Sequence, residues 1–417
     1  MVFGGFEFYF QIIIFIVLTI LFSAFWYFDT LFSPILLNGK QKVILWLIKC
    51  FFHVAYITNI LMNNNENKDY DLIEFFDECR KLKHYAIYRW TDFKLIMLSI
   101  TDKQFFSEHI SVDDRFTHWN SASNFFILKL NFIFYIFSFD SIFIHHLYGT
   151  FLFFLCLMLS FKMLESMVQC NFRHFIILSC IPFFSYYTVG ISKDTLFFCA
   201  LSLLFYVWQL QNYRLAFKCI ISIIILIFSI QFRASWIIIL LVSFVVALIY
   251  NIKNIKHKNY LYITVLAAIA LVAFNYNFLI EILQQKQLEF SAIVGSSTLE
   301  PLSTNFNILT ILYNIPHAIW RTILCDFPKN ISISIFIALI ESILLFLFIL
   351  YFKQKSNKRN NIKHSTLIFF SIVSIIIIGL TVNNCGAIVR YRSLFYFIIM
   401  YFFMIKYLPQ NNNTCKI

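Results

Sequence analysis

The sequence predicts an all-α fold, a polytopic integral membrane helical bundle with about 11–12 transmembrane helices and two large outer loops. The composition indicates this directly. Apolar residues make up 60% of the 417, charged residues only 13%, and phenylalanine alone supplies 54, which is far from the composition of a soluble domain. At about 20 residues per spanning helix, the apolar residues fill about ten to twelve spans. We therefore expect one polytopic membrane domain over 1–417, with any chemistry placed in its loops or inside the bundle.

The first apolar stretch, 8–28, predicts a retained span rather than a cleaved signal, because no Lys or Arg precedes it. The apolar piece 124–139 contains Lys129 and is about 16 residues long, so it fits a re-entrant or interfacial helix as well as a span. Ten further stretches have the length and composition of spans: 43–61, 143–161, 174–189, 195–210, 216–230, 235–250, 260–280, 331–352, 364–382 and 389–407.

Alternate connections between these spans differ sharply in their number of Lys and Arg residues. One side holds sixteen, whereas the three short connections of the other side hold only Lys193, Arg233, Arg390 and Arg392. The positive-inside rule then places the rich side in the cytoplasm and the amino terminus outside, provided that 124–139 does not cross; if it crosses, only the part upstream inverts. We therefore attribute the net charge of +12 to Lys and Arg residues that orient the protein in the membrane, and we expect no nucleic-acid partner.

Two long segments, 62–142 and 281–330, face outward in this topology and offer room for a substrate. The first opens with acidic side chains that include Asp69 and Asp71. The chain carries no Walker loop, no GxGxxG and no metal-ligand spacing, so no cofactor and no metal are predicted. We interpret the ten cysteines as small apolar fillers.

The second outer segment ends in the amphipathic stretch ILYNIPHAIWRTILCDFPKN. Pro316 and Pro328 punctuate it, which indicates a helix at the membrane interface. We expect the Trp320 ring at headgroup level and the Arg321 guanidinium just above it, where it suits a lipid-linked phosphate.

Charged residues at the outer ends of spans are the main candidate site residues, because an ionisable group near a bilayer is costly unless it lines a polar pathway or binds a ligand. In VGISKD, Gly190 permits a tight turn, Lys193 provides a cation, and Asp194 lies where a cap begins the next helix. The alternative is a capped turn in which this lysine only pairs with Asp194. Arg233, in FSIQFRASW, stands against the positive-inside trend.

Arg390 and Arg392, in NNCGAIVRYRSLF, are the other outer arginines. A spacing of two places them on different faces of a helix but on one face of an extended segment. Guanidinium groups bind phosphate oxygens through two parallel hydrogen bonds, which Lys cannot do; simple snorkelling is the alternative for each arginine. We expect Lys193, Arg233 and Arg390 to converge on one outer, lipid-accessible cavity, because three cations on the disfavoured side need a common anionic partner.

Glu341, inside IALIESILLF, is a carboxylate placed deep within a predicted span. Such a group needs a partner in the membrane. We expect that partner to be one of these arginines or a buried hydroxyl, and the pair can be structural or functional.

Taken in order, these features resemble bacterial surface-polysaccharide membrane enzymes: the O-antigen and capsule repeat-unit polymerases (Wzy class) and the related type C membrane glycosyltransferases. The elements that carry the resemblance are the early acids of the first outer loop, PFFSYYTVGISKDTLFF, the turn FRASW, the late loop ending in WRTILCDFPKN, and NNCGAIVRYRSLF. Asp69 and Asp71 match the first-outer-loop acid of type C enzymes by position.

The resemblance implies a sugar donor carried on a polyprenyl phosphate or pyrophosphate in a bacterial inner membrane, attacked by a sugar hydroxyl at the outer face. Cations at span ends would stabilise the leaving phosphate, and a carboxylate would take the hydroxyl proton. We accordingly expect Asp69, Asp71 and Glu341 as catalytic residues. The residues expected to bind the phosphate are Lys193, Arg233, Arg321, Arg390 and Arg392. This scheme requires no metal, although a type C enzyme can use one at its acidic loop.

Three functions compete at this stage. A polymerase or lipid-linked glycosyltransferase accounts for the outer cations and the polar outer loops. A flippase or exporter of the same lipid-linked sugars would show internal symmetry and matched Gly or Pro breaks, and a structural or sensory membrane protein is the third candidate. The expected partners are the polyprenyl-linked oligosaccharide and the lipid bilayer, and the resemblance leaves open a chain-length regulator.

Overall fold

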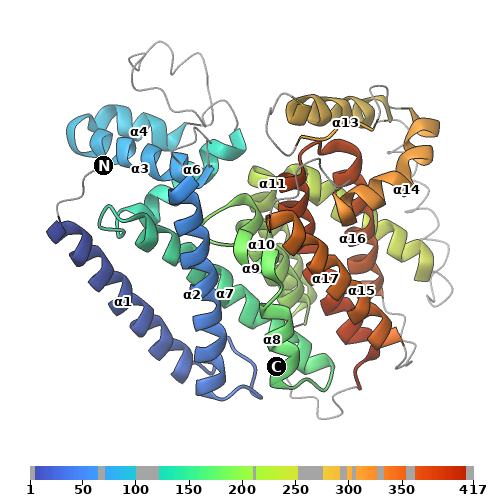
Figure 1. Ribbon diagram of the computed structural model, residues 1–417, viewed down its shortest axis with the longest axis horizontal. Helices are drawn as coiled ribbons and strands as arrows, with labels where there is room; N and C mark the ends of the chain where they lie inside the picture. Colours follow the sequence, from blue (N-terminus) through green and yellow to red (C-terminus); the bar gives the residue numbers. More distant parts are fainter. Residues whose placement is uncertain are drawn as a thin grey trace. The chain divides into compact units, whose positions relative to one another are not determined.

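The computed structural model describes residues 5–63, 71–99, 122–209, 213–251, 276–291, 298–302, 307–325, 333–353 and 362–409. Within these ranges the chain forms fifteen helices and no β-strand (Figure 1). Five of the helices are long and apolar enough to cross a membrane: Tyr9–Phe28, Gly39–Met62, Ile142–Met167, Ala216–Arg233 and Cys385–Tyr407. The chain is therefore an all-α, multi-pass membrane protein, as its composition predicts.

The five candidate spans coincide with five of the predicted ones. The predicted spans 331–352 and 364–382 fall on α15 (Ile333–Lys353) and α16 (Ile362–Thr381), which contain the shorter apolar stretches Phe336–Tyr351 and Thr366–Thr381. The predicted span 260–280 lies mostly outside the described residues.

Internal contacts divide the chain into two compact units. Unit 1 is Met1–Cys180, Ser185–Ala234 and Asn412–Ile417, and unit 2 is Ile181–Phe184 and Ser235–Asn411. The single membrane domain expected over 1–417 stays a prediction.

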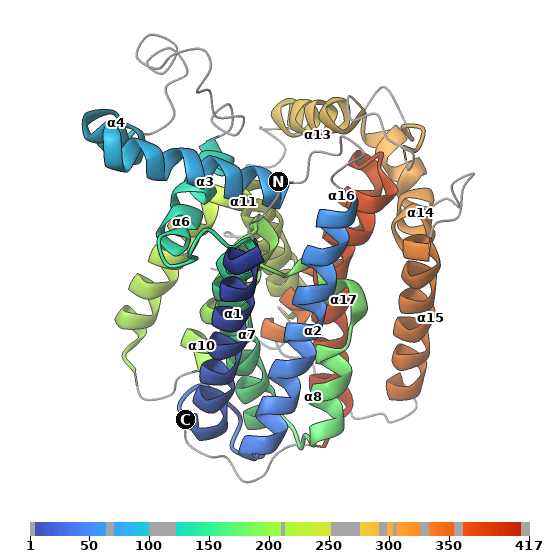
Figure 2. The ribbon, with the colours of Figure 1, turned by 60° about the vertical axis from the view of Figure 1, so that its left-hand side comes forward.

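Unit 1 is built around three helices that pack on one another, α1, α2 and α7 (Figure 2). Aromatic rings fill the space between them: Phe22 stacks on Phe151 with ring centroids 4.3 Å apart, and Trp26 and Trp46 both meet Phe154 edge-on. Both tryptophans are completely buried. Up to residue 167, the helices of this unit are α1 (Gly5–Phe28), α2 (Gly39–Asn63), α3 (Asp71–Tyr88), α4 (Trp90–Leu98), α6 (Ala122–Tyr135) and α7 (Ile142–Met167).

The connection between α1 and α2 is held against the end of α7. Glu165 accepts hydrogen bonds from two backbone N–H groups of this connection, at 2.7 and 2.8 Å. Lys162 donates to the Leu31 carbonyl at 2.6 Å, and Lys42 donates to the Asp29 carbonyl. The end of α1, the start of α2 and the end of α7 therefore lie together, at the lysine-bearing end of unit 1 that the positive-inside rule predicts to be cytoplasmic.

The predicted span 174–189 is wrong, because the segment forms two short helices, α8 (Phe172–Ser179) and α9 (Pro182–Tyr187). Pro182 has no N–H to donate to a preceding turn, so it interrupts α8 and opens a new helix at its first position. Apolar length alone does not register this interruption.

The next helix, α10 (Lys193–Gln209), runs parallel to α7. Phe198 packs on Phe153 with ring centroids 4.9 Å apart, and Ser160 donates to Ser202 at 3.0 Å. The earlier residue of α10 contacts the earlier residue of α7, and the later residue of α10 contacts the later one. This order shows that the two helices run in the same direction.

The predicted spans 216–230 and 235–250 belong to α11 (Leu215–Asn251), which is interrupted only at Arg233, where φ is −148° and ψ is 55°. The predicted turn FRASW is thus a one-residue break. By contrast, α6 has 14 residues and is about 21 Å long. This is too short to cross a hydrocarbon core of about 30 Å, which favours the re-entrant or interfacial alternative for 124–139.

In unit 2, α14 packs closely on α16, and α17 packs on α15 and α16. Gly379 of α16 allows α14 to pack this closely, since a Cβ at this position would overlap the Ala318 carbonyl oxygen. Thr322 also donates to the Ile375 carbonyl at 2.9 Å between these helices. Besides α15 and α16, unit 2 contains α13 (Tyr276–Ser291), α14 (Ile308–Leu324) and α17 (Cys385–Tyr407).

Candidate substrate-binding site

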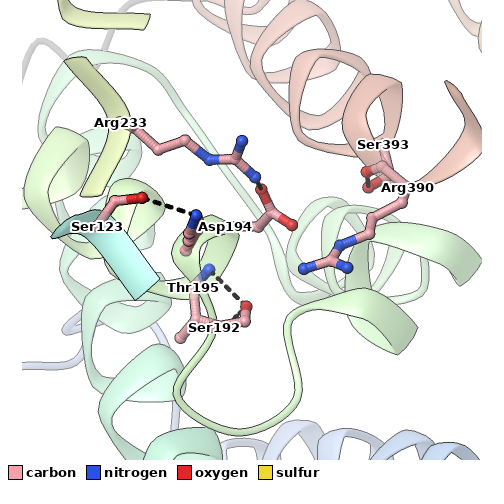
Figure 3. Close-up of polar contacts among 8 residues, drawn as sticks. Ser123, Ser192, Asp194, Thr195, Arg233, Arg390 and Ser393 are labelled. Carbon is pink, nitrogen blue, oxygen red and sulfur yellow. Dashed lines mark hydrogen bonds and ion pairs between the residues drawn. The ribbon is translucent and has the colours of Figure 1, made fainter. Parts of the chain in front are cut away.

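The segment 188–192, between α9 and α10, is a buried, non-helical break in unit 1. Gly190 adopts φ of +69°, and Gly149 of α7 packs directly against it. The Ser192 hydroxyl accepts a hydrogen bond from the Thr195 N–H at 3.2 Å, so Ser192 caps the first turn of α10 (Figure 3). Since Gly149 is seven residues into α7, the break lies about 11 Å along that helix from its first residue.

Asp194, on the first turn of α10, forms a buried ion pair with Arg233 at the break in α11 (Figure 3). Arg233 Nη2 lies 2.6 Å from Asp194 Oδ1, and the two side chains are 15% and 6% exposed. The predicted role of Asp194 as a cap is therefore wrong, because Ser192 caps the helix and the Asp194 carboxylate binds Arg233. Removal of either partner from such a pair costs about 3–5 kcal/mol, because an uncompensated charge stays buried.

Lys193 donates to the Ser123 hydroxyl at the start of α6, at 2.9 Å. We refer to Ser123, Lys193, Asp194 and Arg233 as the Asp194 cluster. The break lies against Gly149 of α7, sixteen residues before the Glu165 that holds the α1–α2 connection, which is about 24 Å along the helix axis. The cluster thus belongs to the end of unit 1 opposite the lysine-bearing connection.

Arg390 and Arg392 lie on different faces of α17, which is helical through both, so the extended alternative is excluded. Arg392 is completely buried. Its guanidinium donates to the carbonyls of Thr322 at 2.6 Å, Ile323 at 2.5 Å and Ala338 at 2.7 Å. Two of these carbonyls belong to the last turn of α14, where a cation is favoured. These contacts indicate that Arg392 holds α14, α15 and α17 together.

Arg390 is half-buried in unit 2, whereas Lys193 and Arg233 belong to unit 1. The structure brings Lys193 and Arg233 into one cluster. Their expected convergence with Arg390 stays a prediction.

Arg321 does not have the exposed position expected beside Trp320: its side chain is buried, whereas Trp320 is 55% exposed. The guanidinium donates to the Glu300 carbonyl at 2.5 Å and contacts Asn383 Oδ1 at 3.5 Å. The Leu299 N–H donates to the Asn383 carbonyl at 2.7 Å in the same place. Consecutive helical residues point to different faces, so Trp320 faces outward while Arg321 ties a loop segment to the connection before α17.

Glu341 is buried in α15 and contacts α9 within unit 2. Its Oε1 accepts a hydrogen bond from the Phe183 N–H at 3.1 Å, at the start of α9, where negative charge is favoured. Its Oε2 has no hydrogen-bond partner among the described residues. The partner of this carboxylate among the described residues is therefore a backbone N–H, and not the arginine or hydroxyl that the sequence analysis expects.

The two other expected catalytic acids precede or begin α3. Asp69 lies outside the described residues, and Asp71 is the first residue of α3. That helix packs on α6 and is tied to the connection between α6 and α7 by an ion pair of 2.7 Å between Lys83 and Asp140. The catalytic roles of Asp69 and Asp71 stay predictions.

The sequence analysis missed a group of buried polar residues around the break, namely Lys49, His53, Asn131, His145 and Thr150. The first two stand four residues apart inside a correctly predicted span. An ionisable residue inside a span is a functional candidate by default, so the sequence held a signal for both. His145, inside the predicted span 143–161, gives the same signal, whereas Asn131 and Thr150 acquire a role only when the break packs against them.

Among the described residues, no three His, Cys, Asp or Glu side chains gather in a way that could hold a metal ion. The nine cysteines in this part of the chain are free thiols. Comparison with known proteins found no matching family model, curated protein or solved structure. Fold and site together define a multi-pass helical membrane protein with a buried charged cluster, and its function is argued from that cluster.

Proposed function

We propose that this chain is a membrane enzyme of surface-polysaccharide synthesis. It transfers sugars from a polyprenyl phosphate or pyrophosphate carrier at the outer face of a bacterial inner membrane, as O-antigen and capsule polymerases do. The observation that carries the proposal is the buried Arg233–Asp194 pair beside Lys193. Charges are retained inside membrane bundles where they meet a ligand or line a pathway.

The Asp194 cluster suits an anionic headgroup whose hydrocarbon tail stays in lipid. Arg233 provides a fork for two phosphate oxygens, Lys193 adds a second cation, and the start of α10 favours negative charge. Arg233 also ends the span Ala216–Arg233, of which only 17% is buried. An exposed stripe runs along this helix at helical spacing and offers the prenyl chain an apolar track: Ile220, Ile223, Ile224 and Ile227.

Binding of the phosphate supplies a base for the reaction. The phosphate takes the place of Asp194 on the guanidinium, and the freed carboxylate accepts the proton of the attacking hydroxyl. The hydroxyl oxygen bonds to the anomeric carbon as the bond from that carbon to the phosphate oxygen breaks. The phosphate leaves with the electron pair and is stabilised by Lys193 and Arg233. Asp69, Asp71 and Glu341 are the alternative bases.

The proposal is tested with the full-length protein in lipid nanodiscs and a panel of polyprenyl-pyrophosphate-linked sugars, with products identified by mass spectrometry. We expect a lengthened glycan and free polyprenyl pyrophosphate. Arg233→Gln should lower turnover by about a hundredfold or more, the usual effect of removing one donor that stabilises developing charge. Lys218→Met, on the same helix but outside the cluster, is the matched control. Parent-like turnover in Arg233→Gln and Asp194→Asn would contradict the proposal.

A flippase or exporter of lipid-linked sugars is the second candidate, and the break 188–192 between α9 and α10 favours it. Discontinuous helices at a substrate site are typical of secondary transporters. In liposomes with a fluorescent lipid-linked sugar, a flippase would expose the inner-leaflet label to an impermeant reductant without changing the glycan. Translocation with unchanged glycan would replace the enzyme proposal.

A further inference from the structure

The break 188–192 is held at its beginning by a buried lysine of α2. Lys49 donates to the Ser185 carbonyl at 2.6 Å and to the Thr188 hydroxyl at 2.9 Å. Its ammonium also lies 4.2 Å from the centre of the Phe153 ring. The Ser185 carbonyl belongs to the end of α9, where a cation is favoured. A charged side chain that is only 3% exposed is therefore committed to this short stretch of backbone.

Two further side chains hold the middle and end of the break. Thr150 of α7 accepts a hydrogen bond from the Gly190 N–H at 3.3 Å, and Asn131 of α6 donates to the Ile191 carbonyl at 3.1 Å. Backbone groups inside a membrane bundle must be satisfied by the protein when they leave a helix. Lys49, Thr150 and Asn131 supply those partners from three different helices.

Histidines in turn orient Thr150 and Asn131. His53 Nε2 faces the Phe143 carbonyl at 3.1 Å, and its Nδ1 lies 2.9 Å from the Thr150 hydroxyl, which also lies 2.9 Å from the His146 carbonyl. The hydroxyl donates its single proton to one of these two acceptors and keeps its lone pairs. This leaves the Thr150 oxygen free to accept from the break. His145 Nε2 likewise lies 2.9 Å from Asn131 Oδ1, which directs the amide N–H groups of Asn131 toward backbone carbonyls.

We propose that Lys49, Asn131 and Thr150 are positioning residues that place Asp194 for its ion pair with Arg233. They fix the backbone on both sides of Gly190, and Asp194 follows Ile191 by only three residues. The Ser192 cap fixes the first turn of α10, which contains Asp194, relative to this backbone. This inference concerns the ion pair itself and holds whichever substrate the cluster binds.

The test reads the protonation of Asp194 by infrared spectroscopy of the full-length protein in nanodiscs. A buried carboxylate that loses its cation takes up a proton, whereas loss of packing alone does not protonate this residue. Relative to the parent and to Lys218→Met, we expect Lys49→Met and Arg233→Gln to show an additional carboxylic-acid C=O band at neutral pH. Adding Asp194→Asn to either variant should remove the band.

Two milder variants keep the proposal falsifiable if Lys49→Met fails to fold. Thr188→Val removes one acceptor of Lys49, and Asn131→Leu removes the contact with Ile191; both should give a weaker band of the same origin. Absence of the band in Lys49→Met, Thr188→Val and Asn131→Leu, with the band present in Arg233→Gln, would overturn the proposal. Because no sugar transfer is measured, failure of the transferase assay leaves this result unaffected.

Discussion

Gly149 of α7 and Gly190 of the helix break are in direct backbone contact: a Cβ on Gly149 would overlap the carbonyl carbon of Gly190. A Cβ on Gly190 would in turn overlap the His146 ring. The chain has only 8 glycines, and two of them meet here. The absence of both side chains is what lets the break that leads to Asp194 lie against α7.

Gly149→Ala should therefore displace the break and lower the melting temperature of the protein, because overpacking a filled site typically costs about 1–3 kcal/mol. Gly386→Ala is the matched control. Its added Cβ meets only the Asn384 side chain, at 3.3 Å, and the residue is exposed. Thermal unfolding in nanodiscs measures both variants. Equal melting temperatures would show that α7 tolerates the extra methyl group.

The Asp194–Arg233 pair should behave as a coupled unit. Asp194→Asn and Arg233→Gln each leave one buried charge, at a cost of about 3–5 kcal/mol. The double variant leaves none, so it should melt at a higher temperature than either single variant. Strictly additive losses in this double-mutant cycle would mean that the two side chains do not stabilise each other.

Arg392 and Arg390 should differ in their effect on stability although they are two residues apart. Arg392→Met removes hydrogen bonds to three carbonyls, and bonds to a charged donor contribute about 1.5–3 kcal/mol each. We expect a severe loss of folded protein in this variant and a small one in Arg390→Met. Detergent-solubilised yield and melting temperature report the difference, and similar values for the two variants would argue against the packing role of Arg392.

The ion pair between Lys83 and Asp140 should make a small contribution to stability that disappears in acid. Partial burial raises the pKa of Asp140, but hydrogen bonds from Lys83 and Tyr135 outweigh burial, so the pKa lies below its ordinary value. A carboxyl of this kind stabilises the fold above its ordinary pKa of about 3.9 and loses that effect as pH falls through the lower folded-state value.

Asp140→Asn is the suitable variant, because Asn also tolerates the left-handed backbone found at this position, where φ is 57°. The side chains of the pair are 46% and 44% exposed, so solvent screening keeps the effect small. The variant should melt slightly below the parent near neutral pH, and the gap should shrink as the pH falls below about 3.9. A gap that widens on acidification would refute the assigned pKa direction.

The connection 353–363 should face the cytoplasm and 281–330 the outside, because five Lys and Arg in eleven residues resist translocation. Alkaline phosphatase fused after Lys358, which lies outside the described residues, should be inactive. The same enzyme fused after Ser291 should be active. Phosphatase activity at Lys358 would reverse the orientation of this part of the chain.

Apolar length was sufficient to predict α1, α2, α7, the first part of α11 and α17, because a span needs little more than enough consecutive apolar residues. It failed at 174–189, where one proline outweighs the surrounding apolar residues. For the site, the number of Lys and Arg residues in alternate connections identified Lys193 and Arg233 as unusual cations. It could not identify the partner of Arg233, which is 39 residues away in the sequence, and it passed over Lys49 inside a span.

The sequence by itself determined that this is a helical, multi-pass membrane protein, because partitioning into lipid depends on local composition. Only the tertiary structure decided what each cation does. Arg233 binds a carboxylate, Arg321 and Arg392 bind backbone carbonyls, and Lys49 holds a helix break. The reason is physical: a buried charge is satisfied by whichever acceptors the packing of distant helices brings within hydrogen-bonding distance, and that packing is not encoded in the spacing of neighbouring residues.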